Sequence, residues 1–481
     1  MASLGSGEST ARVYDRTPEP VGERSHRDRT QGAEPRSSAL LLLPLAAESR
    51  EALRRQLMGA WSMLSKARTW QECSVLCQAM AERCSSAPQR VILQAESRQA
   101  LLDQLARSQA LEPSDATGQR PQLIFVCSGQ GSQWLGMMRP LLAAEPAFRT
   151  VIEECDDLVQ QRYGWSLLAE LAADESRSHL DATDVSQLAI ASIQLALGAL
   201  WRAWGIVPDA LLGHSLGEVT ACGLAGILSL EDTLRVVGER AAVLRNGTQV
   251  PGGMVVVTLP EGRTSSGVLQ LTRELDLAAY NSPNSLVLSG SVDAIQRLEP
   301  QLRAEGFKPE RVSVRYASHC AHMDACMSPL QERLAGIAPR TGTLPVRGTS
   351  RENWLSGPSC GPEFWAQNLR NPVRFRQAID AIVAEGSAIF VELSPHPLLL
   401  ESIAQTLQAA AGHGLTLASC YRGDDDRRSM LATLATLHRA GFQANWQQVF
   451  GARANLAGLP LSSSALQELD LLFGERREPR L

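Results

Sequence analysis

The chain has 481 residues, of which 44% are hydrophobic and 20% are charged, and both values are ordinary for a globular protein. Its formal net charge of −5 argues against a basic surface for nucleic acid or for an anionic membrane. A chain of this length can bury a large core, and we expect two or three domains.

The composition changes abruptly near residue 38. Residues 1–37 are rich in Arg, Glu, Ser, Gly and Pro and almost free of aliphatic side chains, so we predict a disordered leader there. Residues 38–120 are predicted to form a small α/β domain that ends in a polar segment. Its first strand is the longest apolar run of the chain, residues 39–47, which is too short to cross a bilayer. The other elements predicted here are helices at 49–64, 69–84 and 97–107 and a strand at 90–94.

The ten cysteines include no Cys-x-x-Cys pair. Cys73, Cys77 and Cys84 follow one another at helical spacing, which would also suit a metal-binding face. No histidine lies near them to complete such a site, so we interpret them as an apolar stripe of a helix and predict no metal. Unpaired thiols are typical of a reducing compartment, and we expect the protein in the cytoplasm.

Strand and helix patterns alternate after residue 121. An apolar strand at 123–127 runs into a glycine-rich loop, and Trp134 is predicted to open the next helix. This alternation predicts a parallel sheet covered on both faces, built from residues 121–250 and 315–425. The other elements predicted here are strands at 210–213 and 389–393 and helices at 147–162, 187–203, 216–227 and 231–246.

The order of elements changes in residues 251–314, which read strand, helix, strand, strand, helix, strand. This is the ferredoxin-like order, and we predict a subdomain inserted into the larger unit. The strands are expected at 254–259, 276–280, 285–289 and 311–314, and the helices at 265–273 and 292–305. Residues 426–481 are predicted to form a C-terminal linker, with a helix at 428–440, and a tail. The predicted fold class is therefore α/β, with an α/β-hydrolase-like core around a parallel sheet, the inserted subdomain and the small N-terminal domain.

Residues 211–219 read Leu-Leu-Gly-His-Ser-Leu-Gly-Glu-Val, which places Ser215 in a Gly-x-Ser-x-Gly frame. This frame sets a serine on a sharp turn from a strand to a helix, with its hydroxyl clear of the sheet. The turn leads into a helix N-terminus, which favours developing negative charge. The frame predicts acyl transfer through a serine ester, and it fits a hydrolase as well as a transferase.

A serine nucleophile needs a general base, and the chain has eight histidines. His319 is the best candidate, because it follows the last strand of the inserted subdomain, where the chain re-enters the large one. A structural histidine with satisfied hydrogen bonds is the alternative interpretation of this position. His214 adjoins the serine, but its side chain should point to the other side of the turn. The histidines expected to be exposed are His179, His413 and His438.

An oxyanion hole needs two backbone N–H groups aimed at one point. One is expected from Leu216, and the second from the glycine-rich loop at 128–133, which would otherwise be a plain tight loop. That loop lacks the Gly-Lys ending and the third glycine of the phosphate-binding patterns. Arg240 lies on the helix predicted at 231–246. It is either a solvated side chain or a clamp that holds a carboxylate through its guanidinium.

Six motifs occur in this order: Gly-Gln-Gly-Ser-Gln, Gly-His-Ser-Leu-Gly-Glu, Glu-Arg, Tyr-Asn-Ser-Pro, Tyr-Ala-Ser-His and Asn-Leu-Arg-Asn-Pro-Val-Arg-Phe. Together they resemble the malonyl-CoA:acyl-carrier-protein transacylase family, and specifically the acyltransferase domains of modular polyketide synthases. The resemblance covers residues 123–450. Residues 39–111 resemble the linker between ketosynthase and acyltransferase in those synthases, and residues 420–465 resemble the post-acyltransferase linker.

The resemblance implies a catalytic pair. Ser215 would be the nucleophile that becomes an acyl ester, and His319 would act first as general base and then as general acid. In this family a backbone carbonyl orients the histidine, so no aspartate is required. The resemblance places that carbonyl near residues 368–372.

The resemblance also implies residues that bind the substrate. The amides of Gln130 and Leu216 would donate to the oxyanion, and Arg240 would hold the free carboxylate of a malonyl-type acyl group. A hydrolase of neutral esters has no use for a buried arginine at that place. The further substrate-binding residues are Tyr316, Ser318, Asn281 and Gln187.

The residues before the histidine vary with the acyl group in this family. Tyr-Ala-Ser-His resembles methylmalonyl-selective domains, whereas malonyl-selective ones usually carry His-Ala-Phe-His. Serine at position 318 leaves room for a methyl branch that phenylalanine would crowd, and residues 184–187 favour the same interpretation. Leu216 departs from it, because methylmalonyl domains more often have glutamine there. We expect a methylmalonyl or larger 2-alkylmalonyl unit, with malonyl as the alternative.

The implied activity is transfer of an acyl group from CoA to Ser215 and then to the phosphopantetheine thiol of an acyl carrier protein, in ping-pong order. Two alternatives are an editing hydrolase of acyl-carrier thioesters and an inactive docking scaffold. Arg240 weighs against the hydrolase, and the intact Ser215 and His319 weigh against the scaffold. The expected partners are acyl-CoA, an acyl carrier protein and the ketosynthase of a synthase. No bound cofactor, nucleic acid or membrane is expected, and we expect a free-standing enzyme.

Overall fold

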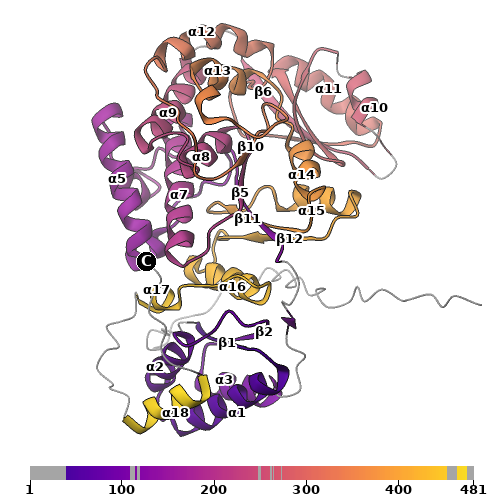
Figure 1. Ribbon diagram of the computed structural model, residues 1–481. Coiled ribbons are helices and arrows are strands. Elements are labelled where there is room, and N and C mark those ends of the chain that lie inside the picture. The colour runs from indigo at the N-terminus through magenta and orange to yellow at the C-terminus, as the bar shows by residue number, and fades with distance from the viewer. Residues whose placement is uncertain are drawn as a thin grey trace, which may run out of the picture. The chain divides into compact units, whose positions relative to one another are not determined.

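The computed structural model describes residues 40–108, 114–115, 120–246, 251–260, 263, 265–271, 273–451 and 463–473. The predicted leader, residues 1–37, lies outside the described residues. The described strands form three sheets, and helices pack around each of them (Figure 1).

The first sheet is antiparallel, in the order β1-β2-β3. Its strands are β1 (Leu41–Ala47), β2 (Gln89–Ala95) and β3 (Ser114–Asp115), and its helices are α1 (Arg50–Lys66), α2 (Trp70–Ala81) and α3 (Arg98–Ser108). Every residue of β1 is buried, which confirms the strand predicted from the apolar run. Ser49 and Thr69 accept hydrogen bonds from backbone amides of α1 and α2, and these N-caps explain where the two helices begin.

Three helices come last among the described elements: α16 (Asp426–Arg439), α17 (Trp446–Gly451) and α18 (Ser463–Phe473). Helix α16 packs against β1 and β2 on one side and against β12 (Gly414–Ala418) and α4 (Arg139–Ala144) on the other. Helix α18 packs on α1 and α2, where Arg83 forms an ion pair with Asp470 at 2.7 Å.

His438 on α16 is fully buried, so the prediction that it is exposed is wrong. Its ring lies 5.4 Å from the ring of Trp446, and Arg90 of β2 donates to its backbone carbonyl at 3.3 Å. Burial lowers the pKa of His438 to about 3, which keeps its imidazole neutral. The polar local sequence does not predict this burial, because α16 is covered by β2 and β12, two strands that lie far from each other in the sequence.

The central sheet has five parallel strands in the order β10-β5-β4-β11-β12. Besides β12 they are β4 (Gln122–Cys127), β5 (Ala210–Gly213), β10 (Val346–Arg347) and β11 (Ala388–Leu393). Alternate residues of β4 face different layers: Phe125 belongs to one hydrophobic cluster, and Ile124 and Val126 belong to another. The sheet is therefore covered on both faces, as predicted.

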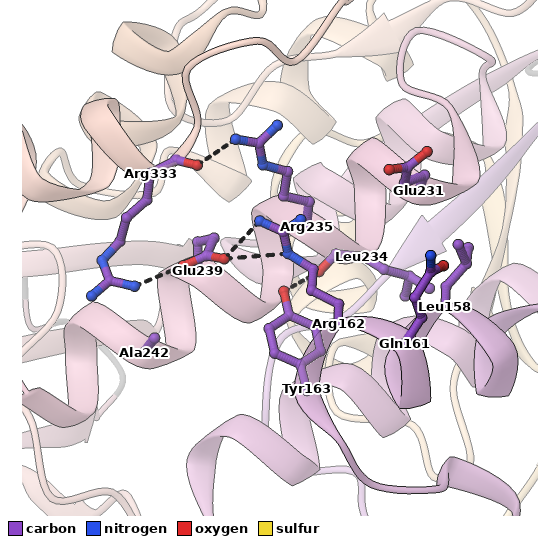
Figure 2. Close-up of a pocket in the computed structure, with 10 residues that line it drawn as sticks. All are labelled: Leu158, Gln161, Arg162, Tyr163, Glu231, Leu234, Arg235, Glu239, Ala242 and Arg333. Atoms are coloured by element: carbon purple, nitrogen blue, oxygen red, sulfur yellow. Dashed lines mark hydrogen bonds and ion pairs between the residues drawn. The ribbon is translucent and has the colours of Figure 1, made fainter.

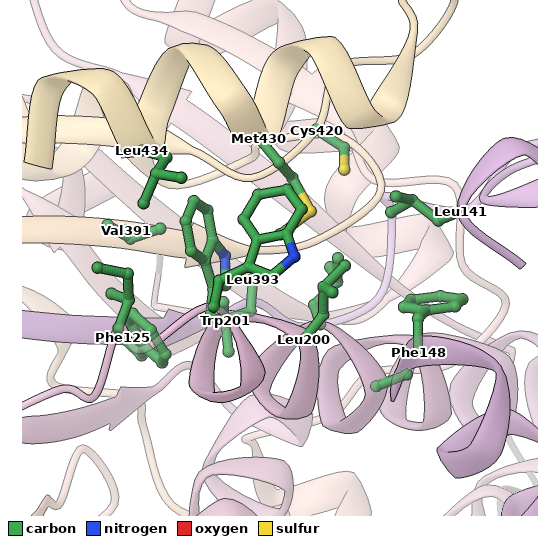
Figure 3. Packing of buried hydrophobic residues seen from close by; sticks show 14 of the residues in the cluster. Phe125, Leu141, Phe148, Leu200, Trp201, Val391, Leu393, Cys420, Met430 and Leu434 are labelled. Atoms are coloured by element: carbon green, nitrogen blue, oxygen red, sulfur yellow. The ribbon is translucent and has the colours of Figure 1, made fainter. Parts of the chain in front are cut away.

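The first of these layers is formed by α5 (Pro146–Tyr163), α7 (Thr183–Ala203), α8 (Leu216–Leu224) and α9 (Leu230–Asn246). The second is formed by α14 (Phe375–Val383) and α15 (Leu400–Ala409). Trp201 of α7 packs against Phe125, and its Nε1 donates to Ser419 Oγ at 3.0 Å. Met430 belongs to the same hydrophobic cluster (Figure 3). Burying such an indole contributes roughly 3–5 kcal/mol to the free energy of unfolding.

Within the described residues, α7 is the one helix whose length and composition would allow it to cross a membrane. Most of its surface is buried, and it packs against α5, α8 and α9. These contacts are those of a core helix that covers the sheet.

The remaining elements of the large unit are the helices α6 (Leu167–Ala172), α12 (Asp324–Arg333) and α13 (Pro362–Arg370) and the short turns η1 (Ala321–Met323) and η2 (Gly357–Ser359). The prediction that Trp134 opens a helix is wrong, because α4 begins at Arg139. Gly136 and Met138 have φ angles of 85° and 63°, which no right-handed helix accommodates.

The third sheet is antiparallel, in the order β7-β8-β6-β9. Its elements are β6 (Gly252–Thr258), α10 (Ser265–Leu271), β7 (Asp276–Ser282), β8 (Ser285–Ser291), α11 (Val292–Ala304) and β9 (Lys308–Arg311). This confirms the predicted ferredoxin-like order. The last strand lies earlier than the predicted 311–314, because pairing with β6 sets its register from Lys308 to Arg311. The predicted α/β fold, with a parallel sheet and a small antiparallel subdomain, is confirmed.

Candidate active site

Ser215 lies on the turn between β5 and α8, with φ 55° and ψ −110°. The flanking glycines allow this turn to pack tightly. A Cβ atom at Gly217 would lie 1.9 Å from the carbonyl oxygen of Cys127 at the end of β4, and one at Gly213 would lie 2.3 Å from the backbone of Glu218. The two glycines therefore hold the serine at the carboxyl end of the sheet, in the strained geometry that the sequence frame predicts.

Ser215 and His319 come together in the structure. The Oγ atom of Ser215 lies 2.7 Å from Nε2 of His319. On the other side of the ring, Nδ1 lies 2.8 Å from the carbonyl oxygen of Asn371, and the backbone amide of His319 donates to the carbonyl of Leu369 at 2.9 Å. Because a carbonyl only accepts, Nδ1 carries the proton and Nε2 is free to accept from the serine.

Burial and the nearby positive charge of Arg240 lower the pKa of His319 from 6.5 to about 3. His214 adds to this effect, whereas hydrogen bonds to the backbone of Asn371 and Asn368 oppose it. The imidazole is therefore neutral throughout the physiological range, which is the state in which it can take a proton from Ser215.

The glycine-rich loop after β4 lies beside the serine turn. A Cβ atom at Gly129 would lie 3.4 Å from the carbonyl oxygen of His214, and Gln194 of α7 donates to the carbonyl of Ser128 at 2.8 Å. In the described part of the chain, the backbone amides of Gln130 and Leu216 donate to no other group. Both are free to bind an oxyanion formed next to Ser215.

Arg240 of α9 is 2% exposed, and its Nη2 lies 3.4 Å from Ser215 Oγ. Among the described residues, its Nε and Nη1 atoms have no hydrogen-bond partner. Burial lowers the pKa of Arg240 to about 10, so the guanidinium stays charged at neutral pH. A buried cation with two unused donors is costly, and an anion bound beside the serine would remove that cost.

Residues 124–444 match the family model described as "Acyl transferase domain". The match covers the serine turn, the histidine and the arginine just described, and it extends over more than half of the chain. The chain belongs to the acyl transferase domain family.

Curated relatives of this acyltransferase domain are polyketide synthases. The chain is 36% identical over 421 residues to polyketide synthase GfsB of Streptomyces halstedii, an alignment that covers 85% of this chain and 8% of GfsB. It is 33% identical over 480 residues to the spectinabilin polyketide synthase system protein NorA of Streptomyces orinoci, covering 97% of this chain and 25% of NorA. The chain thus spans a quarter or less of the length of these two relatives.

Solved acyltransferase domains share the fold. The acyltransferase domain from module 8 of the salinomycin polyketide synthase superposes with a TM-score of 0.75 and 30% identity, and the alignment covers 85% of this chain and 98% of that domain. The family resemblance drawn from the six motifs is therefore confirmed.

The other predicted substrate-binding residues of this acyltransferase domain make three separate sets of contacts. Tyr316 and Gln187 are buried, and both contact the side chain of Gln130. Ser318 is also buried, with its hydroxyl 3.3 Å from the sulfur of Met254 on β6. The Oδ1 atom of Asn281 lies 2.9 Å from Nε2 of His214, whose ring packs against Phe375 with the ring centres 5.4 Å apart.

The sequence assigns no role to Glu218, although it ends the Gly-His-Ser-Leu-Gly-Glu motif. Its side chain is fully buried, and its carboxylate accepts from the backbone amide of Thr349 and from Nδ2 of Asn368, both at 2.6 Å. The same Nδ2 lies 3.5 Å from the carbonyl oxygen of Ser215. Glu218 thus fixes the start of α8 against the segment that carries Asn371. A charged residue in an otherwise apolar first helical turn is the sequence signal for such a role.

A separate groove of about 620 Å³ lies between α5, α9 and the end of α12 (Figure 2). There Glu239 accepts from Arg162 and from Arg333, each at 3.0 Å, and Arg235 donates to the carbonyl of Arg333 at 2.7 Å. The residues that line it include no predicted site residue. We assign these ion pairs the structural role of joining three helices.

All ten cysteines are buried. Cys73 and Cys77 lie on α2 as predicted, whereas Cys84 lies beyond the end of that helix at Ala81. In the part of the chain that the structure describes, no group of three or more His, Cys, Asp or Glu side chains could hold a metal ion.

The depressed pKa of His319 leads to a pH prediction. Since the imidazole of the free protein is already unprotonated, the second-order rate constant of Ser215 acylation, measured well below saturating substrate, should stay level from about pH 5 to about pH 8. By linkage, the same shift lowers the free energy of unfolding as the pH falls from 6.5 toward 3, because the unfolded chain then binds the proton more strongly. Rates should therefore be measured by rapid quench only where circular dichroism shows folded protein. A rate that falls with a midpoint near 6.5 would contradict the prediction.

Proposed function

We propose that this chain is an acyltransferase that moves a malonyl-type extender unit from CoA to the phosphopantetheine thiol of an acyl carrier protein. The observation that carries the proposal is the buried guanidinium of Arg240, with two unused donors, beside the Ser215–His319 pair. A carboxylated acyl group supplies the anion that this cation lacks, and its thioester carbonyl can lie next to Ser215.

In the first half-reaction, His319 Nε2 takes the hydroxyl proton as Ser215 Oγ attacks the thioester carbonyl carbon. The carbonyl oxygen becomes an oxyanion, which the amides of Gln130 and Leu216 bind. The tetrahedral intermediate then collapses, the C–S bond breaks, and the CoA thiolate takes the proton from His319. The products are free CoA and an acyl ester on Ser215.

The second half-reaction is the same chemistry with the pantetheine thiol as nucleophile. His319 removes the thiol proton, the sulfur attacks the ester carbonyl, and the oxyanion again binds to the two amides. Collapse breaks the ester bond and returns the proton to Ser215 Oγ. The Asn371 carbonyl keeps Nδ1 protonated in both steps, so one tautomer serves the whole cycle.

The substrate carboxylate has a second effect in this mechanism. The charge of Arg240 helps to depress the pKa of His319 in the free protein. When a carboxylate pairs with Arg240, that repulsion is offset and the imidazole becomes a stronger base. A malonyl-type substrate thus strengthens the base that reacts with it, whereas an acetyl thioester does not.

We infer that the favoured extender unit is methylmalonyl or a larger 2-alkylmalonyl group. Support comes from Tyr316 and Ser318, which the family resemblance relates to a branched α-carbon. The Ser318 hydroxyl contacts Met254, whose flexible thioether can adjust to a methyl branch. One methyl group changes the discrimination by only about 1–3 kcal/mol, so we expect slower but measurable use of malonyl groups.

The proposed partners are acyl-CoA, an acyl carrier protein and a ketosynthase, and the proposed compartment is the cytoplasm. The relatives named above are polyketide synthases, which supports a carrier protein as acceptor. In the same proposal, residues 38–120 and 426–481 correspond to the linkers that flank the acyltransferase in such synthases.

Transfer and editing hydrolysis predict different products. Incubation with methylmalonyl-CoA and a carrier protein bearing phosphopantetheine should give acyl-carrier protein at least about 10 times faster than free methylmalonic acid. Mass spectrometry of the carrier and chromatography of the acid measure both products in one sample. The carrier without phosphopantetheine is the control. Release of free acid as the main product, with little acyl-carrier protein, would instead assign the chain as an editing hydrolase.

A further inference from the structure

The side chain of Gln130 joins the oxyanion loop to two other parts of the site. Its Nε2 donates to Ser186 Oγ at 3.0 Å, and its Oε1 accepts from the Tyr316 hydroxyl at 2.8 Å and from Gln187 Nε2 at 3.2 Å. Ser186 and Gln187 belong to the first turns of α7, and Tyr316 precedes His319 by three residues. One amide therefore connects the loop, the helix and the histidine segment.

Ser186 sets the direction of that amide. The residue is fully buried, and its one hydroxyl proton points to the carbonyl of Thr183 at 3.2 Å. The hydroxyl oxygen is then left to accept, so it takes the NH₂ end of Gln130 and turns the carbonyl end toward Tyr316. Without a hydroxyl at position 186, Nε2 of Gln130 would lose its acceptor and the amide would be free to rotate.

We propose that Ser186 is a positioning residue for acyl transfer, acting through the Gln130 side chain on the oxyanion loop. This inference rests on the proposed function, in which the backbone amide of Gln130 binds the oxyanion. Because both the NH₂ and the carbonyl end of the Gln130 side chain are hydrogen-bonded, the backbone N–H of Gln130 is held in place before the substrate arrives. Its transition-state contact is then made without the entropy cost of ordering the loop.

The same network changes what Tyr316 can do. Its phenolic proton goes to Gln130 Oε1, and burial raises the pKa of Tyr316 to about 12, which keeps the phenol protonated. No proton is left for donation to a substrate carboxylate. Tyr316 therefore contributes its ring and its oxygen lone pairs to the acyl site, and the carboxylate charge is left to Arg240.

The test compares Ser186→Ala with Ser192→Ala. Ser192 is a matched control, because it is fully buried on the same helix, and its hydroxyl donates to the carbonyl of Leu188 at 2.8 Å instead of accepting from the loop. Ser186→Ala should lower the single-turnover rate of Ser215 acylation about 10-fold and leave KM for the CoA thioester within about twofold. Ser192→Ala should leave both within about twofold. Thermal melting of both variants shows whether folding is kept.

A double-mutant cycle with Gln130→Leu separates positioning from a merely structural role. This variant keeps the backbone amide but removes the anchored side chain, and it tests the inference even if Ser186→Ala fails to fold. Each single variant should lower the single-turnover rate of Ser215 acylation about 10-fold, and the double variant should lower it no further than either single variant does. Wild-type acylation rates in Ser186→Ala, or losses that multiply in the double variant, would overturn the inference alone. No acylation of Ser215 in the wild-type protein would overturn the proposed function as well.

Discussion

Replacing Arg240 with alanine is expected to lower kcat/KM for methylmalonyl-CoA by roughly 30-fold to several thousand-fold, which corresponds to about 2–5 kcal/mol. The guanidinium is buried, lies 3.4 Å from the Ser215 hydroxyl, and has two donors without partners in the described chain. In the variant, the substrate carboxylate would enter a buried site with nothing to pair it. Steady-state rates of CoA release with a thiol reagent measure the effect.

The discriminating comparison uses acetyl-CoA, which carries no free carboxylate. Its slow rate should be unchanged or higher in Arg240→Ala, because loss of the cation also removes a cause of the depressed pKa of His319. Arg235→Ala is the matched control on the same helix, since that guanidinium donates to the carbonyls of Arg333 and Ala335 in the groove of Figure 2. Arg235→Ala should change kcat/KM by no more than about twofold for either thioester. An equal loss of kcat/KM for both thioesters in Arg240→Ala would contradict the role of Arg240 in binding the substrate carboxylate.

Replacing His319 with alanine is expected to lower the acylation rate by roughly 1,000-fold or more, and Ser215→Ala should abolish acylation. His319 is the only histidine within hydrogen-bond distance of Ser215 Oγ among the described residues, and its other nitrogen is fixed by the Asn371 carbonyl. Rapid-quench mass spectrometry of the acyl-enzyme measures both rates.

His179→Ala serves as the control, because this histidine is exposed. His214→Ala is the sharper comparison. His214 adjoins the serine in sequence, but its ring is hydrogen-bonded to Asn281. His214→Ala should therefore lower the acylation rate much less than His319→Ala does. Acylation at the wild-type rate in His319→Ala would exclude it as the base.

Local sequence predicts those parts of the molecule that are decided by short-range sterics and periodicity. The serine turn follows from Gly213 and Gly217, whose missing side chains the structure requires. Strand β1 follows from an unbroken apolar run. The ferredoxin-like order follows from the alternation of patterns, although pairing with β6 moves the last strand to Lys308–Arg311.

What the sequence does not predict depends on contacts between distant segments. Helix α16 reads as polar, yet His438 is buried because strands from two sheets cover it. The family resemblance places the carbonyl that orients His319 only near residues 368–372, because a main-chain group has no signature of its own, and in the structure it is that of Asn371. The hydroxyl of Ser186 acquires its role only when α7 packs beside the loop that carries Gln130.

Intact-protein and peptide mass spectrometry of the wild-type chain, mixed with equal amounts of acetyl-, malonyl- and methylmalonyl-CoA, tests the central claim most directly. We predict one acyl adduct per chain, on the peptide that contains Ser215, with methylmalonyl as the main group, malonyl as the minor one and acetyl hardly present. An adduct on another residue, no adduct at all, or acetyl as the main group would contradict a Ser215 acyltransferase that selects carboxylated units through Arg240.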